Sequence, residues 1–183
     1  GKNDFLKSFL LGLPLAIIQP FSVVIIIVIL VTRLLLEITQ NIKRDLTSFL
    51  KSRYFFMLIG LGVTGGLMLL YQYWSIVTDP VLSIWNTQNR TPSPDLLDFL
   101  VSFFLVLGIG LFGINAARKS DLGITLLVWS ITSILLILIP WNLPRRFITG
   151  LYVPLGGLAV IGLKEITKNK ELSFVRWGII LAL

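Results

Sequence analysis

The chain has 183 residues, of which 55% are hydrophobic and only 14% are charged, whereas a soluble domain carries about a quarter charged residues. The apolar residues form blocks long enough to cross a bilayer, so the composition excludes a soluble domain built around a large core. The net charge is +7, but the basic residues flank the apolar blocks, which favours membrane lipids and argues against nucleic acid as a partner.

The sequence contains no cysteine and no histidine. This excludes disulfides, thiol nucleophiles, zinc sites made of Cys and His, and a Ser-His-Asp triad within the chain. Any proton transfer would use Asp, Glu, Lys, Tyr or a group of the ligand itself. We predict no cofactor and no metal site, and we identify no catalytic residue.

The first apolar block, residues 5–18, is short, and Gln19-Pro20 separates it from a second block at 21–36. This pattern predicts a helical hairpin or one long kinked helix, with Pro20 in the first turn of the second limb. Val and Ile dominate the second block, which would favour a strand in water, but a lone strand is not viable in lipid. We therefore expect helices in both blocks.

Basic residues mark the end of the second block. Arg33 lies near its last turn, and we expect its long side chain to extend the charge to the membrane interface. In residues 37–53, apolar side chains recur at helical spacing with basic ones between them. This pattern predicts a basic amphipathic helix lying in the headgroup region, although an ordinary linker between helices is the alternative.

The rest of the chain alternates between apolar blocks and polar loops. The blocks predict spans at 54–74, 99–117, 122–139 and 148–163, with the start of another at 177–183. The loops are 77–98, 118–121, 140–147 and 164–176. Because the chain starts at Gly1 and ends within an apolar run, we expect a piece of a larger polytopic protein, with the remainder of that polypeptide as a partner. The sequence shows no cleavable signal peptide.

The basic residues gather in alternate loops. Loops 37–53, 118–121 and 164–176 contain Lys43, Arg44, Lys51, Arg53, Arg118, Lys119, Lys164, Lys168, Lys170 and Arg176. The other loops contain Arg90, Arg145 and Arg146, together with Asp79, Asp95 and Asp98. Since cytoplasmic loops carry the excess of Lys and Arg, we predict the first group inside the cell, and loops 77–98 and 140–147 outside. The Gln19-Pro20 break then lies on the outer face.

Two segments match the dinucleotide-binding pattern G-x-G-x-x-G, at residues 60–65 and 108–113. Both lie inside predicted membrane spans, and neither has the strand before it and the helix after it that the fingerprint requires. We interpret them as sites of close helix packing, which Gly62 and Gly66 at four-residue spacing would assist.

Loop 77–98 is rich in hydrogen-bonding side chains, with Trp85, Asn86 and Asn89 among them. Amide groups beside an aromatic ring suit a sugar or a polar headgroup. The sequence Ser93-Pro94-Asp95 predicts the start of a helix, with Ser93 as the cap and Asp95 against the positive end of the dipole. We therefore interpret Ser93 and Asp95 as structural.

Loop 140–147 reads Pro-Trp-Asn-Leu-Pro-Arg-Arg-Phe and contains the strongest indication of a ligand-binding site in the chain. Arg145 and Arg146 stand on the face where arginine is statistically disfavoured, and two guanidinium groups can grip a phosphate through paired hydrogen bonds. With Asn142 they are candidate substrate-binding residues. The same charges could instead contact lipid headgroups or pair with Asp79, Asp95 or Asp98.

Two segments, 79–94 and 140–154, resemble the C-terminal half of bacterial polytopic membrane proteins described as glycosyltransferase-like, of the GT-C type. In that family the arginine pair also precedes a Gly and a Pro, which match Gly150 and Pro154. The Gln19-Pro20-Phe21 turn is similar to a His-Pro-Phe/Tyr turn of the family, with Gln19 in place of the histidine.

This resemblance implies a polyprenyl-phosphate-linked sugar donor bound at the outer face, with the catalytic acid in an early loop that this sequence does not contain. Gln19 would then lie at the substrate site without a proton-transfer role. The alternative is a non-enzymatic membrane protein, such as a transporter half or a component of an envelope assembly. A transporter would favour charges or broken helices near the middle of the membrane, and we find no charge in mid-span.

Overall fold

The computed structural model describes residues 1–40, 49–139 and 144–168. All regular secondary structure in these ranges is helical, which confirms the all-α class. Five helical segments are long and apolar enough to cross a membrane: Pro20–Gln40, Arg53–Thr78, Leu96–Ala117, Asp121–Leu138 and Arg145–Lys168. The protein is thus a helical, multi-pass membrane protein by length and composition. The predicted span at 177–183 and residues 41–48 of the predicted amphipathic helix at 37–53 lie outside the described residues.

The chain divides into two compact units. Unit 1 comprises Gly1–Ser93 and Leu135–Thr149, and unit 2 comprises Pro94–Ile134 and Gly150–Leu183. Each unit is described by itself below.

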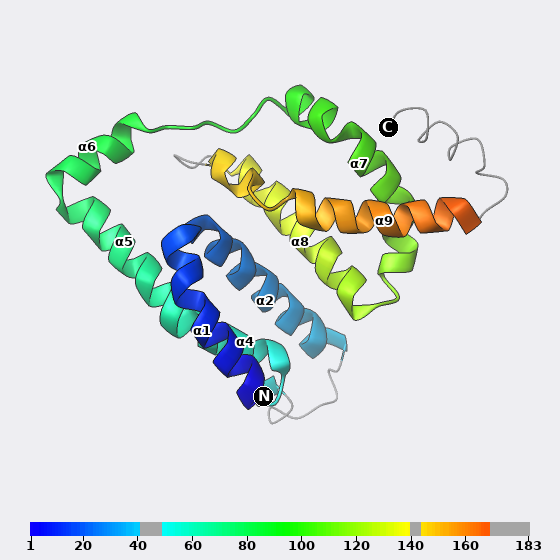
Figure 1. Ribbon diagram of the computed structural model, residues 1–183, viewed down its shortest axis with the longest axis horizontal. Helices are drawn as coiled ribbons and strands as arrows, with labels where there is room; N and C mark the ends of the chain where they lie inside the picture. The colour runs from blue at the N-terminus through cyan, green and yellow to red at the C-terminus, as the bar shows by residue number, and fades with distance from the viewer. Residues whose placement is uncertain (41–48, 140–143, 169–183) are drawn as a thin grey trace. The chain divides into compact units, whose positions relative to one another are not determined.

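Unit 1 begins with a helical hairpin of α1 (Lys2–Ile18) and α2 (Pro20–Gln40), which lie side by side in Figure 1. Gln19 forms the turn, where its N–H bonds to Leu15 O at 2.7 Å. Pro20 begins α2, a position where the missing N–H costs no helical hydrogen bond. Of the two predicted alternatives, the hairpin is therefore the one that forms. The helix α2 runs on through residues 37–40, which we had assigned to the amphipathic segment.

A second long helix of unit 1 consists of α4 (Arg53–Leu61), the π-helical turn η1 (Gly62–Gly66) and α5 (Leu67–Thr78). Side-chain hydrogen bonds join it to α1. Thr64 Oγ1 donates to Phe9 O at 3.0 Å, and Gln72 Nε2 donates to Ala16 O at 3.1 Å. The sequence separations of these two bonds are 55 and 56, so the two helices run in the same direction.

Glycines bring α1 and the second long helix together. A Cβ added to Gly60 would lie 2.5 Å from Phe5 O, and one added to Gly12 would lie 2.1 Å from Thr64 Oγ1. The prediction of close packing in the segment 60–65 is confirmed for Gly60 and Gly65, but the assistance expected from Gly62 and Gly66 was wrong. Gly62 and Gly66 face open space, because the π-helical turn widens the helix there and shifts the face that meets α1.

Arg33 is buried, with 7% of its surface exposed. Its Nη2 and Nε donate to the Tyr54 hydroxyl at 2.6 and 3.2 Å, and its Cζ lies 5.0 Å from the centre of the Tyr54 ring. The prediction that Arg33 extends to the interface was therefore wrong. A phenol from α4 satisfies the guanidinium inside the unit, so the charge has a hydrogen-bond partner without reaching outward.

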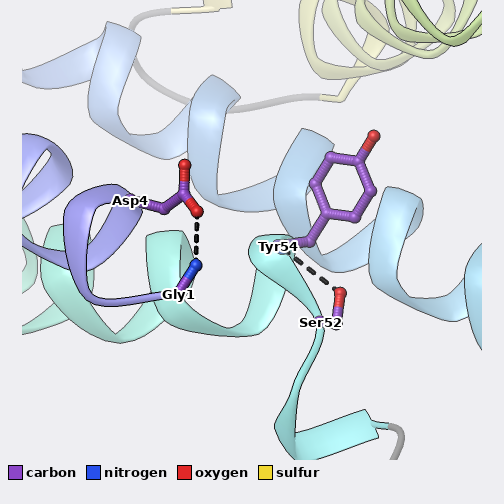
Figure 2. Close-up of polar contacts among 4 residues, drawn as sticks. All are labelled: Gly1, Asp4, Ser52 and Tyr54. Atoms are coloured by element: carbon purple, nitrogen blue, oxygen red, sulfur yellow. Dashed lines mark hydrogen bonds and ion pairs between the residues drawn. The ribbon is translucent and has the colours of Figure 1, made fainter.

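Figure 2 shows the end of unit 1 where α1 and α4 begin. Ser52 caps α4 by accepting the Tyr54 N–H at 3.2 Å. The Ser52 hydroxyl also donates to the Glu37 carboxylate. The Gly1 ammonium donates to Asp4 at 2.5 Å, which holds the pKa of the Asp4 carboxyl below its usual range. This end of the unit is therefore polar and charged, and the Gln19 turn lies at the opposite end.

Unit 2 consists mainly of α7 (Leu96–Ala117), most of α8 (Asp121–Leu138) and α9 (Tyr152–Lys168). The helices α7 and α9 touch backbone to backbone. A Cβ on Gly113 would lie 2.6 Å from Gly162 N, and one on Gly162 would lie 2.0 Å from Ile109 O. The Phe103 and Tyr152 rings also meet, with centroids 4.7 Å apart. Successive contacts advance together along both helices, so α7 and α9 run in the same direction.

The helix α8 runs against α9. A Cβ on Gly157 would lie 2.9 Å from Leu126 Cδ1, and one on Gly150 would lie 3.9 Å from the Trp129 ring. Moving forward along α8 from Leu126 to Trp129 thus moves backward along α9. Arg118 and Lys119, which join α7 to α8, therefore lie at the same end of unit 2 as the last turn of α9.

The segment 77–98, predicted as a loop, contains α6 (Pro80–Gln88), which follows α5 after Asp79 and has no buried residue. Asp79 caps α6, accepting from Val81 N and Leu82 N at 2.8 and 3.0 Å. The predicted helix start at Ser93 was two residues early, because Asp95 caps α7 by accepting the Leu97 N–H. Ser93 instead donates to Ile137 O at 2.6 Å. The carboxylate is the stronger acceptor for the first amides of the helix.

Candidate anion-binding turn

The arginine pair lies on a short 3-10 helix, η2 (Pro144–Ile148), in unit 1. Arg145 and Arg146 are exposed, whereas Phe147 is 2% exposed. The Phe147 ring meets Phe21 edge to face, with centroids 5.4 Å apart. Since Phe21 is the second residue of α2, this contact fixes the arginine turn beside the Gln19 turn.

Two motifs that are far apart in the sequence are thus brought to one end of unit 1. Gln19 is half-buried and exposes an amide side chain, and η2 presents two guanidinium groups. Together these groups offer hydrogen-bond donors and positive charge, which suit an anionic ligand. An amide does not ionise near neutral pH, so Gln19 can orient a ligand but cannot act as an acid or base.

The arginines are not neutralised within the part of unit 1 that the structure describes. The carboxylate of Asp79, one of the acids that could have paired with them, is occupied as the cap of α6. No ion pair or hydrogen bond of either guanidinium group occurs among the described residues. Within these residues, both groups therefore keep their donors available.

The other candidate substrate-binding residues are not brought to this turn. Trp85 and Asn86 lie on α6, and Asn89 ends α6 with its N–H bonded to Trp85 O at 2.9 Å. Trp85 is 51% exposed, and no described ring contact or hydrogen bond joins it to η2. Asn142 lies outside the described residues.

Two contacts that organise this end of unit 1 were not predicted. The Phe21–Phe147 ring contact holds η2 on α2, and the bond from Ser93 to Ile137 O ties the end of the 77–98 segment to α8. Both contacts join residues far apart in the chain, and local spacing carries no signal for them. A bulky apolar residue directly after two arginines was the one available hint that the turn has an anchor.

Comparisons with protein-family models, with curated proteins and with solved structures find no match to this chain. In the described residues, no group of three or more acidic side chains could hold a metal ion.

Proposed function

We propose that the chain is the C-terminal membrane part of a GT-C-like glycosyltransferase, which uses a polyprenyl-phosphate-linked sugar donor at the outer face of the cell membrane. The proposal starts from the resemblance of the segments 79–94 and 140–154 to that family. Arg145 and Arg146 bind the donor phosphate, and Gln19 lies beside them. The catalytic acid lies outside this sequence.

One observation carries this proposal. Arg145 and Arg146 are exposed on a turn whose next residue, Phe147, is buried against Phe21. A guanidinium that only contacts headgroups needs no fixed backbone, because its long side chain finds the interface by itself. A ring-anchored turn whose two guanidinium groups have no partner among the described residues supports a defined ligand, since pre-organised donors lose less freedom on binding.

The test is polyprenyl-phosphate binding to the full chain in nanodiscs. Each charge-assisted contact is worth about 1.5–3 kcal/mol, so Arg145→Ala or Arg146→Ala should weaken binding about ten- to a hundredfold. Arg→Lys at the same positions should also weaken binding, because lysine keeps the charge but loses the planar fork. Arg90→Ala is the matched control, since Arg90 is exposed and predicted on the same face. Equal binding by all variants would leave the arginines only a headgroup or structural role.

Single cysteines test the proposed orientation, and the chain has no native cysteine to interfere. A cysteine at Ser83 should react with a membrane-impermeant thiol reagent in intact cells, and one at Thr167 should react only after lysis. Reversed labelling would place the arginine turn in the cytoplasm and remove the reason for a lipid-linked donor at the outer face.

The transporter alternative has an observation in its favour. Both units contain helices arranged alike, with the first and third running in the same direction and the second opposed. Repeated helix arrangements within one chain are typical of secondary transporters. Radiolabelled donor discriminates between the two functions. Transfer or hydrolysis of the sugar supports the enzyme, whereas movement of intact donor across a proteoliposome membrane supports the transporter.

A further inference from the structure

Helix α6 exposes its large apolar side chains instead of burying them. The helix contains no buried residue, and four of its apolar side chains are 38 to 74% exposed: Val81, Leu82, Ile84 and Trp85. Successive residues of a helix are about 100° apart, so these four side chains share one half of the circumference. The other half carries the polar residues Ser83, Asn86 and Thr87. The helix is therefore amphipathic, and its apolar half is left uncovered by the described residues.

The polar half of α6 is covered more than the apolar half. Ser83 and Asn86 are half-buried, whereas all four large apolar side chains are exposed. A helix on the surface of a soluble protein shows the opposite arrangement, with its apolar side against the protein. In addition, Pro80–Gln88 contains no Asp, Glu, Lys or Arg. An uncharged helix with its apolar half turned outward fits surroundings that are themselves apolar.

The position of α6 in the chain places it at a membrane boundary. It follows the apolar segment Arg53–Thr78, which is long enough to cross a bilayer. The end of that segment carries three aromatic side chains that are 58 to 69% exposed, Tyr71, Tyr73 and Trp74. Tyr and Trp are enriched where lipid tails meet headgroups, because their rings are apolar and their O–H or N–H groups are polar. The span therefore reaches the interface just before α6 begins.

The chain changes direction between this span and α6 (Figure 1). Asp79 has an extended backbone there, and Pro80 begins the new helix. With nine residues, α6 is about 14 Å long, whereas the hydrocarbon core of a bilayer is about 30 Å thick. The helix is too short to form a span, but it can lie along the boundary with its apolar half in the lipid and its polar half toward water.

From these observations we propose that α6 lies in the membrane interface, with Val81, Ile84 and Trp85 among the lipid acyl chains and its polar half toward the headgroups. The partner is lipid, because lipid is the medium around the exposed apolar residues of the preceding span, Leu70 and Val77 among them. Since α6 carries no charge, zwitterionic lipid suffices. The placement is independent of the proposed sugar donor, and it gives Trp85 a lipid contact in place of a sugar.

Spin labels on single cysteines test this placement, and the chain has no native cysteine. The full chain is placed in nanodiscs of phosphatidylcholine. The experiment measures collisions of each label with O2, which concentrates in lipid, and with a nickel chelate, which stays in water. Labels on Val81→Cys, Ile84→Cys and Trp85→Cys should prefer O2 and lie about 5–10 Å into the boundary of headgroups and acyl chains. Labels on Ser83→Cys and Thr87→Cys should prefer the nickel chelate.

A second variant measures how strongly the apolar half holds α6 in the lipid. In a chain that carries Val81→Cys, Ile84→Asn should raise the rate of reaction with a water-soluble thiol reagent about tenfold, because one apolar side chain fewer is buried in lipid. Thr87→Asn is the matched control, since it introduces the same residue on the polar half. It should leave the rate unchanged.

The same measurements can overturn the proposal. Preference for the nickel chelate at every position would place α6 in water, and preference for O2 at every position would place it within the lipid core. Few collisions with either reagent at positions 81, 84 and 85 would mean that another protein segment covers the apolar half. Equal effects of Ile84→Asn and Thr87→Asn would show that the apolar half does not hold the helix in the membrane.

Discussion

Units 1 and 2 bring their first and third helices together by different means. In unit 2, α7 and α9 meet through the backbones at Gly113 and Gly162, and no side-chain hydrogen bond joins them among the described residues. In unit 1, glycines also permit close approach, but Thr64 and Gln72 add hydrogen bonds to carbonyls of α1. Lipid tails are as apolar as leucine, so helices in a membrane associate by close packing or by polar bonds. This chain uses both solutions.

The largest effect should come from unit 2, where contact depends on missing side chains. Gly162→Ala should destabilise the protein by about 3 kcal/mol, because the new Cβ meets backbone that cannot move aside without separating the helices. Its Cβ would lie 2.0 Å from Ile109 O. Thermal unfolding in detergent, followed by loss of the monodisperse species, measures the effect.

Gly156→Ala is the control for that variant. It lies on the same helix, but its Cβ would enter open space, so stability should stay equal or rise by up to about 1 kcal/mol. Equal unfolding of the two variants would show that α7 and α9 are not in backbone contact.

An intermediate effect is expected in unit 1 from Arg33→Met. The variant keeps much of the side-chain volume but removes both bonds to the Tyr54 hydroxyl, with an expected cost of about 2 kcal/mol. Lys51→Met tests the same change at an exposed position and should leave the melting temperature within error. If Arg33→Met were equally silent, the buried arginine would not hold α2 to α4.

The smallest effect should come from a single bond between helices in unit 1. Gln72→Leu removes the bond to Ala16 O, and such bonds average about 0.6 kcal/mol in membrane proteins. Gln88→Leu, at the exposed end of α6, provides the baseline. A loss above about 2 kcal/mol would mean that polar bonds, and not glycine contacts, dominate the packing of unit 1.

The helical class and most span positions could be predicted because they depend on local composition. A block of apolar residues near bilayer length is expected to form a helix, because a single segment in lipid must satisfy its backbone hydrogen bonds internally. The hairpin at Gln19-Pro20 was one of two predicted alternatives, since proline allows either a turn or a kink. The arginine turn was singled out because its charge opposes the bias of its surroundings.

The predictions that were wrong all concern residues whose contacts are with residues distant in the sequence. Arg33 was expected at the interface because the local sequence gives no sign of its partner. That partner, Tyr54, belongs to another helix. Ser93 fitted a helix cap by local rules, yet Asp95 caps α7 and Ser93 bonds to Ile137 O. The glycine pattern indicated close packing correctly, but the π-helical turn changed which glycines face α1.

The π-helical turn η1 also determines which residues of α5 face α1. Residues 62–66 form one wider turn between α4 and α5, and such turns are equivalent to one extra residue inserted into an ordinary helix. If the same residues formed an ordinary α-helix without losing one, everything after them would be rotated by about 100°, the angle of one residue. Gln72 would then turn away from Ala16, and the aromatic residues Tyr71 and Trp74 would each face a new direction. The extra residue in the π-helical turn therefore determines which face of α5 is turned toward α1. As a result, one continuous helix contacts α1 through both α4 and α5.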